Sequence, residues 1–284
     1  PDVQAWAYYD VDAIRAQAAE IDARPERGPL HGVPVGVKDV INTRDMPTQH
    51  NSARYLGSRP GVDAACVDTL RHAGALIVGK TVTTEFAFTA RGSKTRNPHD
   101  LTRTPGGSSS GSGAAVAAQM ATLALGTQTA ASIVRPAAYC GIVGFKPGFG
   151  LISRAGVKSL SESLDTVGGF GRSVADVALL TSVMANAAAW RDLPEDSKPR
   201  IGICRTPHWD SASAAAQQAF EATVQRLARA GAFVVDVSLP DAVAALTEVH
   251  DEMMCAEAFK ALADERLHHP EWLSERLRAM LERG

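Results

Sequence analysis

The chain has 284 residues, a length that allows one large α/β domain or two smaller ones. Hydrophobic residues make up 45% and charged residues 21% of it, which excludes disordered, collagen-like and coiled-coil proteins. The balance of 29 Lys and Arg residues against 31 Asp and Glu residues gives a net charge of -2 without a run of like charges, so nucleic acid is not expected as a partner.

Neither a membrane span nor a disulfide framework is predicted. The longest apolar stretch, residues 114–125, contains Gln119 and Thr122 and is shorter than the roughly 20 residues that a membrane span needs. The four cysteines are widely spaced and form no CxxC pair. Reduced, buried thiols and a cytoplasmic protein are therefore expected.

The first third of the chain reads as alternating helices and strands. Residues 1–27 predict an amphipathic helix followed by a charged turn. Valines alternate in residues 33–37, which predicts a strand with Lys38 in it or at its end. A helix at residues 63–73 and a buried strand at 75–78 follow, and this order is typical of α/β layering.

The same pattern returns in the second half. Ser173 and Asp176 resemble a capping box that opens a helix running to about Ala188. The polar residues 190–198 are the best candidate for a domain boundary or a surface excursion. Residues 200–237 then read as strand, helix and strand, which predicts a parallel βαβ unit.

A Gly/Ser run at residues 106–113 admits more than one interpretation. In isolation such an octamer is usually a flexible linker. Here the strong helix former 114–120 follows at once, which favours a loop that leads into a helix N-terminus. Gly107 to Gly111 also match G-x-S-x-G with Ser109 at the centre, as in the nucleophile elbow of an esterase. The motif requires a strand before it, but here a polar segment with two prolines precedes it. An esterase that uses Ser109 is therefore only an alternative hypothesis.

A second serine lies in a turn of small residues at 126–137. Backbone N–H groups of such a turn can converge on a developing oxyanion while the serine hydroxyl projects into a cleft. Together with Lys38 and the Gly/Ser run, this turn predicts a site for nucleophilic catalysis.

Four motifs occur in a fixed order: GVPVGVKD at 32–39, GGSSSGSGAA at 106–115, GTQTAASI at 126–133 and CGIVGFKP at 140–147. The set resembles the amidase signature family over roughly residues 30 to 190. The resemblance implies an α/β fold with a large mixed β-sheet covered by helices on both faces. It also implies hydrolysis of a carboxamide without a metal or an organic cofactor.

By this resemblance Lys38 is the base of a Ser-Ser-Lys triad, and Ser108, after a cis peptide bond from Gly107, is the relay. Ser132, 24 positions after Ser108, is the nucleophile. A lysine accepts a proton only when neutral, so burial must lower its pKa from about 10.4. The oxyanion would be held by four backbone N–H groups, those of Thr129, Ala130, Ala131 and Ser132.

Some residues depart from the family pattern. Gln128 stands where Asp is usual, and Ala130-Ala131 where Gly-Gly is common. If position 131 needs a positive φ, alanine costs about 1 kcal/mol and displaces the oxyanion donors, and a catalytically silent protein becomes an alternative. Arg135 is similar to an arginine of the malonamidase branch that binds a substrate carboxylate, although a structural ion pair with a neighbouring carboxylate would also explain it.

The remaining expectations concern organisation and partners. We expect a single amidase domain over 1–284, incomplete at one or both ends or lacking disordered segments, with an N-terminal helical segment at 1–27. A helical segment at 241–284 can cover the site or form a homodimer contact. The expected partner is a small-molecule amide. An alternative is an ammonia-delivering, glutaminase-type subunit of a tRNA-amidating complex.

Three further features of the sequence concern the cleft, a possible ion pair and metal binding. Residues 165–172 could line the substrate cleft or form only a structural turn. Lys80 and Glu85 are candidates for an ion pair, at the surface or near the cleft. The eight histidines show no spacing typical of metal ligands, so no metal site is expected.

Overall fold

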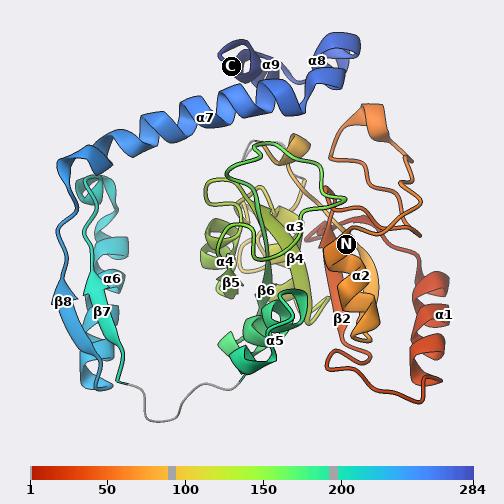
Figure 1. Cartoon of the computed structure of the whole chain (residues 1–284), viewed down its shortest axis with the longest axis horizontal. Helices are drawn as coiled ribbons and strands as arrows, with labels where there is room; N and C mark the ends of the chain where they lie inside the picture. The colour runs from red at the N-terminus through yellow and green to blue at the C-terminus, as the bar shows by residue number, and fades with distance from the viewer. Residues whose placement is uncertain (1, 89–93, 192–197) are drawn as a thin grey trace. The chain divides into compact units, whose positions relative to one another are not determined.

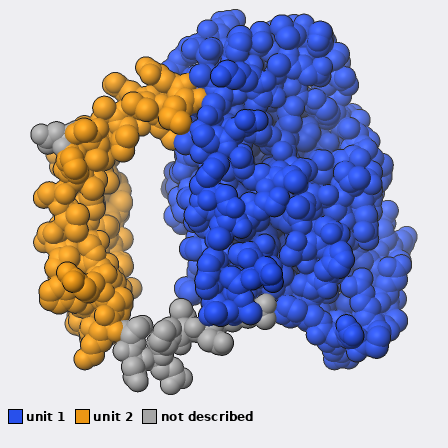
Figure 2. Space-filling model, viewed as in Figure 1, with its two compact units in different colours: residues 1–191, 254–284 blue, residues 192–253 orange. Residues whose placement is uncertain are grey.

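The computed structural model describes residues 2–88, 94–191 and 198–284 (Figure 1). Its internal contacts divide the chain into two compact units, residues 1–191 with 254–284, and residues 192–253 (Figure 2). The boundary predicted at 190–198 falls at this division, but residues 192–197 lie outside the described part. The expectation of a single domain stays a prediction.

The first unit is built on a mixed sheet with the strand order β1-β3-β2-β4-β6-β5. Its strands are β1 (Trp6–Tyr8), β2 (Pro34–Lys38), β3 (Leu76–Thr81), β4 (Leu123–Gln128), β5 (Val143–Phe145) and β6 (Thr166–Gly171). The central strands β3, β2 and β4 are parallel, whereas β1, β6 and β5 each run antiparallel to the strand they pair with. The predicted mixed sheet is therefore confirmed.

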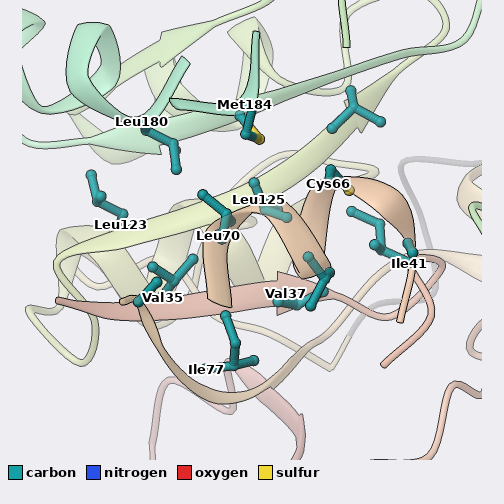
Figure 3. Close-up of a cluster of buried hydrophobic side chains, with 14 of the residues drawn as sticks. Val35, Val37, Ile41, Cys66, Leu70, Ile77, Leu123, Leu125, Leu180 and Met184 are labelled. Atoms are coloured by element: carbon teal, nitrogen blue, oxygen red, sulfur yellow. The ribbon is translucent and has the colours of Figure 1, made fainter. Parts of the chain in front are cut away.

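Helices cover both faces of this sheet. They are α1 (Val11–Asp22), α2 (Ala65–His72), α3 (Ser110–Ala117), α4 (Val134–Cys140) and α5 (Val174–Met184). Val35 and Leu125 pack with α2 and α5 in the largest core cluster (Figure 3). Ala124 and Phe170 pack with α3 and α4 in a second cluster. Successive side chains of a strand point to opposite faces, which explains why Ala124 and Leu125 join different clusters.

Several local predictions are confirmed and one is incomplete. The helix predicted at 63–73 ends before Gly74, which has a φ of 90°. Ser173 and Asp176 form the predicted capping box at the start of α5. The region 1–27 contains α1 but also strand β1, which the helical periodicity did not predict. Three residues are too few to set a pattern, and β1 is fixed by its pairing with β3 at the sheet edge.

The Gly/Ser run is partly helical. Helix α3 begins at Ser110, four residues earlier than the predicted start at 114. A side chain on Gly111 would come within 2.3 Å of both Val82 N and Ala5 O. The run is therefore no flexible linker: its small residues let a buried helix approach neighbouring backbone.

The C-terminal part of the chain is helical, as predicted, with α7 (Leu246–Ala261), α8 (Ala263–His268) and α9 (Glu275–Glu282). Residues 254–284 belong to the first unit. They share one buried cluster with Phe86 and Leu160. Its members from residues 254–284 are Cys255, Ala258, Leu262, Leu273, Leu277, Met280 and Leu281.

The second unit contains the predicted βαβ element, with parallel strands β7 (Arg200–Ile203) and β8 (Phe233–Asp236) and helix α6 (Ala214–Arg229). All four cysteines are free, and only Cys204 is not fully buried. Short 3₁₀ helices lie at Ala53–Tyr55, Glu85–Ala87, Ala188–Arg191, Trp209–Ser211, Asp241–Ala245 and Pro270–Trp272. Within the described ranges, no helix has the length and apolar character needed to cross a membrane.

Candidate active site

Lys38 is the last residue of β2, in the middle of the parallel part of the sheet, and its side chain is fully buried. In its protonated form its Nζ donates hydrogen bonds to Ser108 Oγ at 2.7 Å, to Thr127 Oγ1 at 2.7 Å and to Thr127 O at 3.3 Å. Burial lowers the pKa of Lys38 to about 7, and the negative charge of Asp165 opposes part of this shift. Much of the lysine is therefore neutral near pH 7.

Thr127 gives this neutral amine a defined orientation. A neutral amine has two N–H donors and one lone pair, and Thr127 supplies two acceptors, its hydroxyl and its carbonyl oxygen. The remaining position of the nitrogen faces Ser108, so its lone pair can accept the serine proton. The sequence motifs assign no role to Thr127. The parallel register of β2 and β4, with Val37 opposite Leu125, brings it beside Lys38.

The two predicted serines lie on adjoining segments. Ser108 follows a cis Gly107-Ser108 peptide bond, as expected, and is buried. The next residue, Ser109, donates its backbone N–H to the carbonyl oxygen of Ser132 at 3.4 Å. Lys38 and Ser108, which are far apart in the chain, are thus in contact, and the segment that carries Ser132 adjoins that of Ser108. These segments lie at the carboxyl ends of β2 and β4, where α/β sheets commonly bind ligands.

Gln128 fixes the turn that carries Ser132. Its Oε1 accepts the N–H groups of Ile133 at 2.8 Å and Val134 at 3.0 Å, and its Nε2 donates to Ala130 O at 2.9 Å. The side chain therefore binds the start of α4 and the middle of the turn at once. A carboxylate could accept the same two N–H groups but could not donate to Ala130 O. In the sequence Gln128 stood out only as a departure from a motif.

The turn presents unused backbone donors. Of the four predicted donors, the N–H groups of Ala130, Ala131 and Ser132 make no hydrogen bond within the described part of the chain, and Thr129 is not counted with them because it has a further interaction within the protein. Neither alanine is among the described residues with a positive φ, so the strain considered for position 131 is absent. Three consecutive donors are thus available to an oxygen atom of a ligand, which is what an oxyanion hole needs.

We expect Gln128→Ala to lower the free energy of unfolding by about 1–3 kcal/mol, because it leaves the N–H groups of Ile133 and Val134 without their acceptor. Urea denaturation monitored by circular dichroism measures the change. A loss below about 0.5 kcal/mol would show that water replaces the side chain without cost.

Asp165 lies at the edge of this site, directly before β6. Its Oδ1 accepts a hydrogen bond from Thr129 Oγ1 at 2.5 Å. Its negative charge opposes part of the lowering that burial causes in the pKa of Lys38. Residues 165–172 therefore contribute Asp165 to the site, while Thr166–Gly171 form β6 of the sheet.

The two remaining candidates have different surroundings. Ser109 is fully buried, and its hydroxyl donates to Thr127 O at 3.2 Å. Residues 101–109 contain no strand, so the context of an esterase elbow is missing. Arg135 is the second residue of α4 and is half-buried. Its guanidinium forms no hydrogen bond or ion pair with any described residue, so the structural ion pair considered for it is absent there.

A second buried lysine lies close by. Lys80 pairs with Asp39 at 3.6 Å rather than with Glu85, and it donates to Ile41 O at 2.7 Å and Thr48 Oγ1 at 2.5 Å. Burial lowers the pKa of Lys80 to about 8. Among the described residues, no group of three or more His, Cys, Asp or Glu side chains could hold a metal ion.

Comparison with known proteins gives consistent matches. A family model described as Amidase matches residues 1–283. The A-subunit of the glutamyl-tRNA(Gln) amidotransferase of Acidothermus cellulolyticus is 42% identical over 265 residues, which cover 84% of this chain and 52% of that protein. The protein of the same name from Symbiobacterium thermophilum is 40% identical over 287 residues, covering 93% of this chain and 59% of the relative.

Solved structures agree with these matches. A crystal structure described as an amidase has a TM-score of 0.91 and 34% identity, covering 99% of this chain and 66% of that one. The native peptide amidase from Stenotrophomonas maltophilia has a TM-score of 0.82 at 34% identity, with coverage of 99% and 67%. The chain spans a little over half the length of the curated relatives it matches.

Proposed function

The chain belongs to the amidase signature family, and we propose that it hydrolyses a carboxamide C–N bond through an acyl-enzyme on Ser132. The observation that carries the proposal is the buried contact of 2.7 Å between Lys38 Nζ and Ser108 Oγ, formed by a lysine whose pKa is about 7. A neutral amine in contact with a serine hydroxyl can act as a general base near neutral pH.

In the proposed reaction Lys38 accepts the proton of Ser108, and Ser108 accepts that of Ser132. The Ser132 oxygen then attacks the amide carbon and forms a tetrahedral intermediate. The free N–H groups of Ala130, Ala131 and Ser132 stabilise its oxyanion. The proton returns through Ser108 to the leaving nitrogen, ammonia or an amine departs, and water hydrolyses the acyl-enzyme by the same relay.

Arg135 supports a substrate with a carboxylate near the scissile amide. It lies three positions after Ser132, in the first turn of α4, and no described carboxylate neutralises it. A guanidinium binds a carboxylate through two parallel hydrogen bonds. We therefore favour a small acidic half-amide, as the resemblance to the malonamidase branch also implies.

Arg135→Ala is expected to raise KM for an acidic short-chain amide by about 10- to 150-fold, equivalent to the 1.5–3 kcal/mol of a hydrogen bond to a charged group. Neutral amides of the same size should be little affected. The variant and the wild type are compared on a matched pair, malonamate and its neutral diamide, by ammonia release. Equal losses on both substrates would assign Arg135 a structural role.

A second candidate is a glutaminase step that supplies ammonia to a tRNA-amidating complex. The names of the two curated relatives above favour it, because both are amidotransferase A-subunits. Ammonia release from a panel containing glutamine, acidic half-amides and neutral amides distinguishes the two. Preferred turnover of glutamine, together with co-purifying subunits, would select the second candidate. A folded protein that neither turns over an amide nor reacts with a fluorophosphonate would be catalytically silent.

A further inference from the structure

Asp165 joins the turn of Ser132 to a second loop. The residue is buried, and its Oδ1 accepts the hydroxyl of Thr129, the first residue of that turn. Its Oδ2 accepts the N–H groups of Leu160 at 2.8 Å and Ser161 at 3.0 Å, and the Ser159 hydroxyl at 3.2 Å. A change in the position of this second loop, residues 159–165, would therefore reach Thr129 through one carboxylate.

The loop 159–165 is held from its other side by Glu257, a residue of α7. The Glu257 carboxylate accepts the hydroxyl of Ser161 and both the hydroxyl and the N–H group of Ser163, the last at 3.1 Å. Hydrogen bonds to a carboxylate are stronger than those between neutral groups. Ser161 thus bonds to Asp165 through its backbone and to Glu257 through its side chain.

Apolar packing reinforces this attachment. Leu160 is almost fully buried in the same cluster as Cys255, Ala258 and the other apolar residues of the C-terminal helices. Its two neighbours in the chain are the serines that bond to Asp165. The loop therefore has one side on the C-terminal helices and the other on the turn of Ser132.

We propose that residues 254–284 act as a clamp that positions the oxyanion donors of the Ser132 turn, with Glu257 and Asp165 as positioning residues. The inference rests on the proposed function of Ser132. Glu257 fixes the loop 159–165, and Asp165 transmits that position to Thr129. The next three residues carry the free N–H groups, and oxyanion donors are effective only when held close to their working geometry.

A matched pair of glutamates tests the clamp. Glu257 and Glu85 are both partly buried and both bond to serines at the junction with the C-terminal helices. Glu85 accepts the N–H group of Ser274 at 2.9 Å and its hydroxyl, and it makes no hydrogen bond to a described residue of the loop 159–165. Glu257→Ala and Glu85→Ala thus weaken the same junction, and only the first releases the loop.

For Glu257→Ala we expect kcat to fall at least about tenfold, with KM within about twofold of the wild type, because displaced oxyanion donors act on the transition state. Hydrogen–deuterium exchange of the peptide covering residues 127–135 should also rise. Glu85→Ala should keep the wild-type kcat and exchange. Equal behaviour of the two variants, or a loss confined to KM, would overturn the clamp.

A second variant and the exchange measurement cover the cases in which Glu257→Ala does not fold or the wild type has no activity. If Glu257→Ala does not fold, the double variant Ser161→Ala/Ser163→Ala breaks the same contact from the loop side and must give the same result. If the wild type has no amidase activity, the proposed function fails. The exchange measurement then still decides the structural coupling, since it needs no substrate.

Discussion

Replacing Ser132 by alanine is expected to lower turnover by about 10⁴- to 10⁶-fold, the range for removal of a catalytic nucleophile. The fold should persist, because the half-buried Ser132 side chain loses only its hydroxyl. Mass spectrometry after treatment with a fluorophosphonate measures the effect directly: the wild type should gain one adduct and Ser132→Ala none.

Ser108 and Ser109 provide the controls. Ser108→Ala should impair acylation strongly, because it removes the hydroxyl that contacts Lys38 Nζ. Ser109→Ala should be much milder, since the Ser109 hydroxyl is bonded to the backbone of Thr127. An adduct found on Ser109 instead of Ser132 would contradict the triad and restore the esterase alternative.

Lys38→Ala is the second change with a large expected effect, a loss of about 10²- to 10⁴-fold in turnover, as for removal of a general base. The wild-type kcat/KM should rise with pH along an acid limb near pH 7. The sign follows from the pKa: below about 7 the buried lysine is protonated and cannot accept a proton, and above it the neutral form dominates. The limb should be missing from the residual activity of Lys38→Ala.

Two lysine variants sharpen this test. Lys38→Arg should not restore activity, because a guanidinium stays protonated at working pH. Lys80 is equally buried but does not contact Ser108, so Lys80→Met should keep the acid limb of the wild type. Near-normal turnover by Lys38→Ala would contradict the assignment of Lys38 as the base. So would an acid limb of kcat/KM that is lost in Lys80→Met but not in Lys38→Ala.

Local patterns in the sequence were sufficient for much of the fold. Alternating valines predicted β2, a capping pair predicted the start of α5, and a glycine predicted the end of α2. Each depends on backbone geometry and on side chains within a few positions, which the sequence contains in full. β1 and the early start of α3 were missed because pairing with β3 and contact with Val82 and Ala5 decide them.

The sequence by itself determined the family and the candidates Lys38, Ser108 and Ser132, because ordered motifs preserve residue types. Only the tertiary structure decided what surrounds them. The register of β2 against β4 places Thr127 on the lysine nitrogen, and burial between packed layers lowers the pKa of Lys38. The bonds from Glu257 to the loop 159–165 join residues 94 and 96 positions apart in the chain. Spacing along the chain has no information on such contacts, since they form only when distant elements pack together.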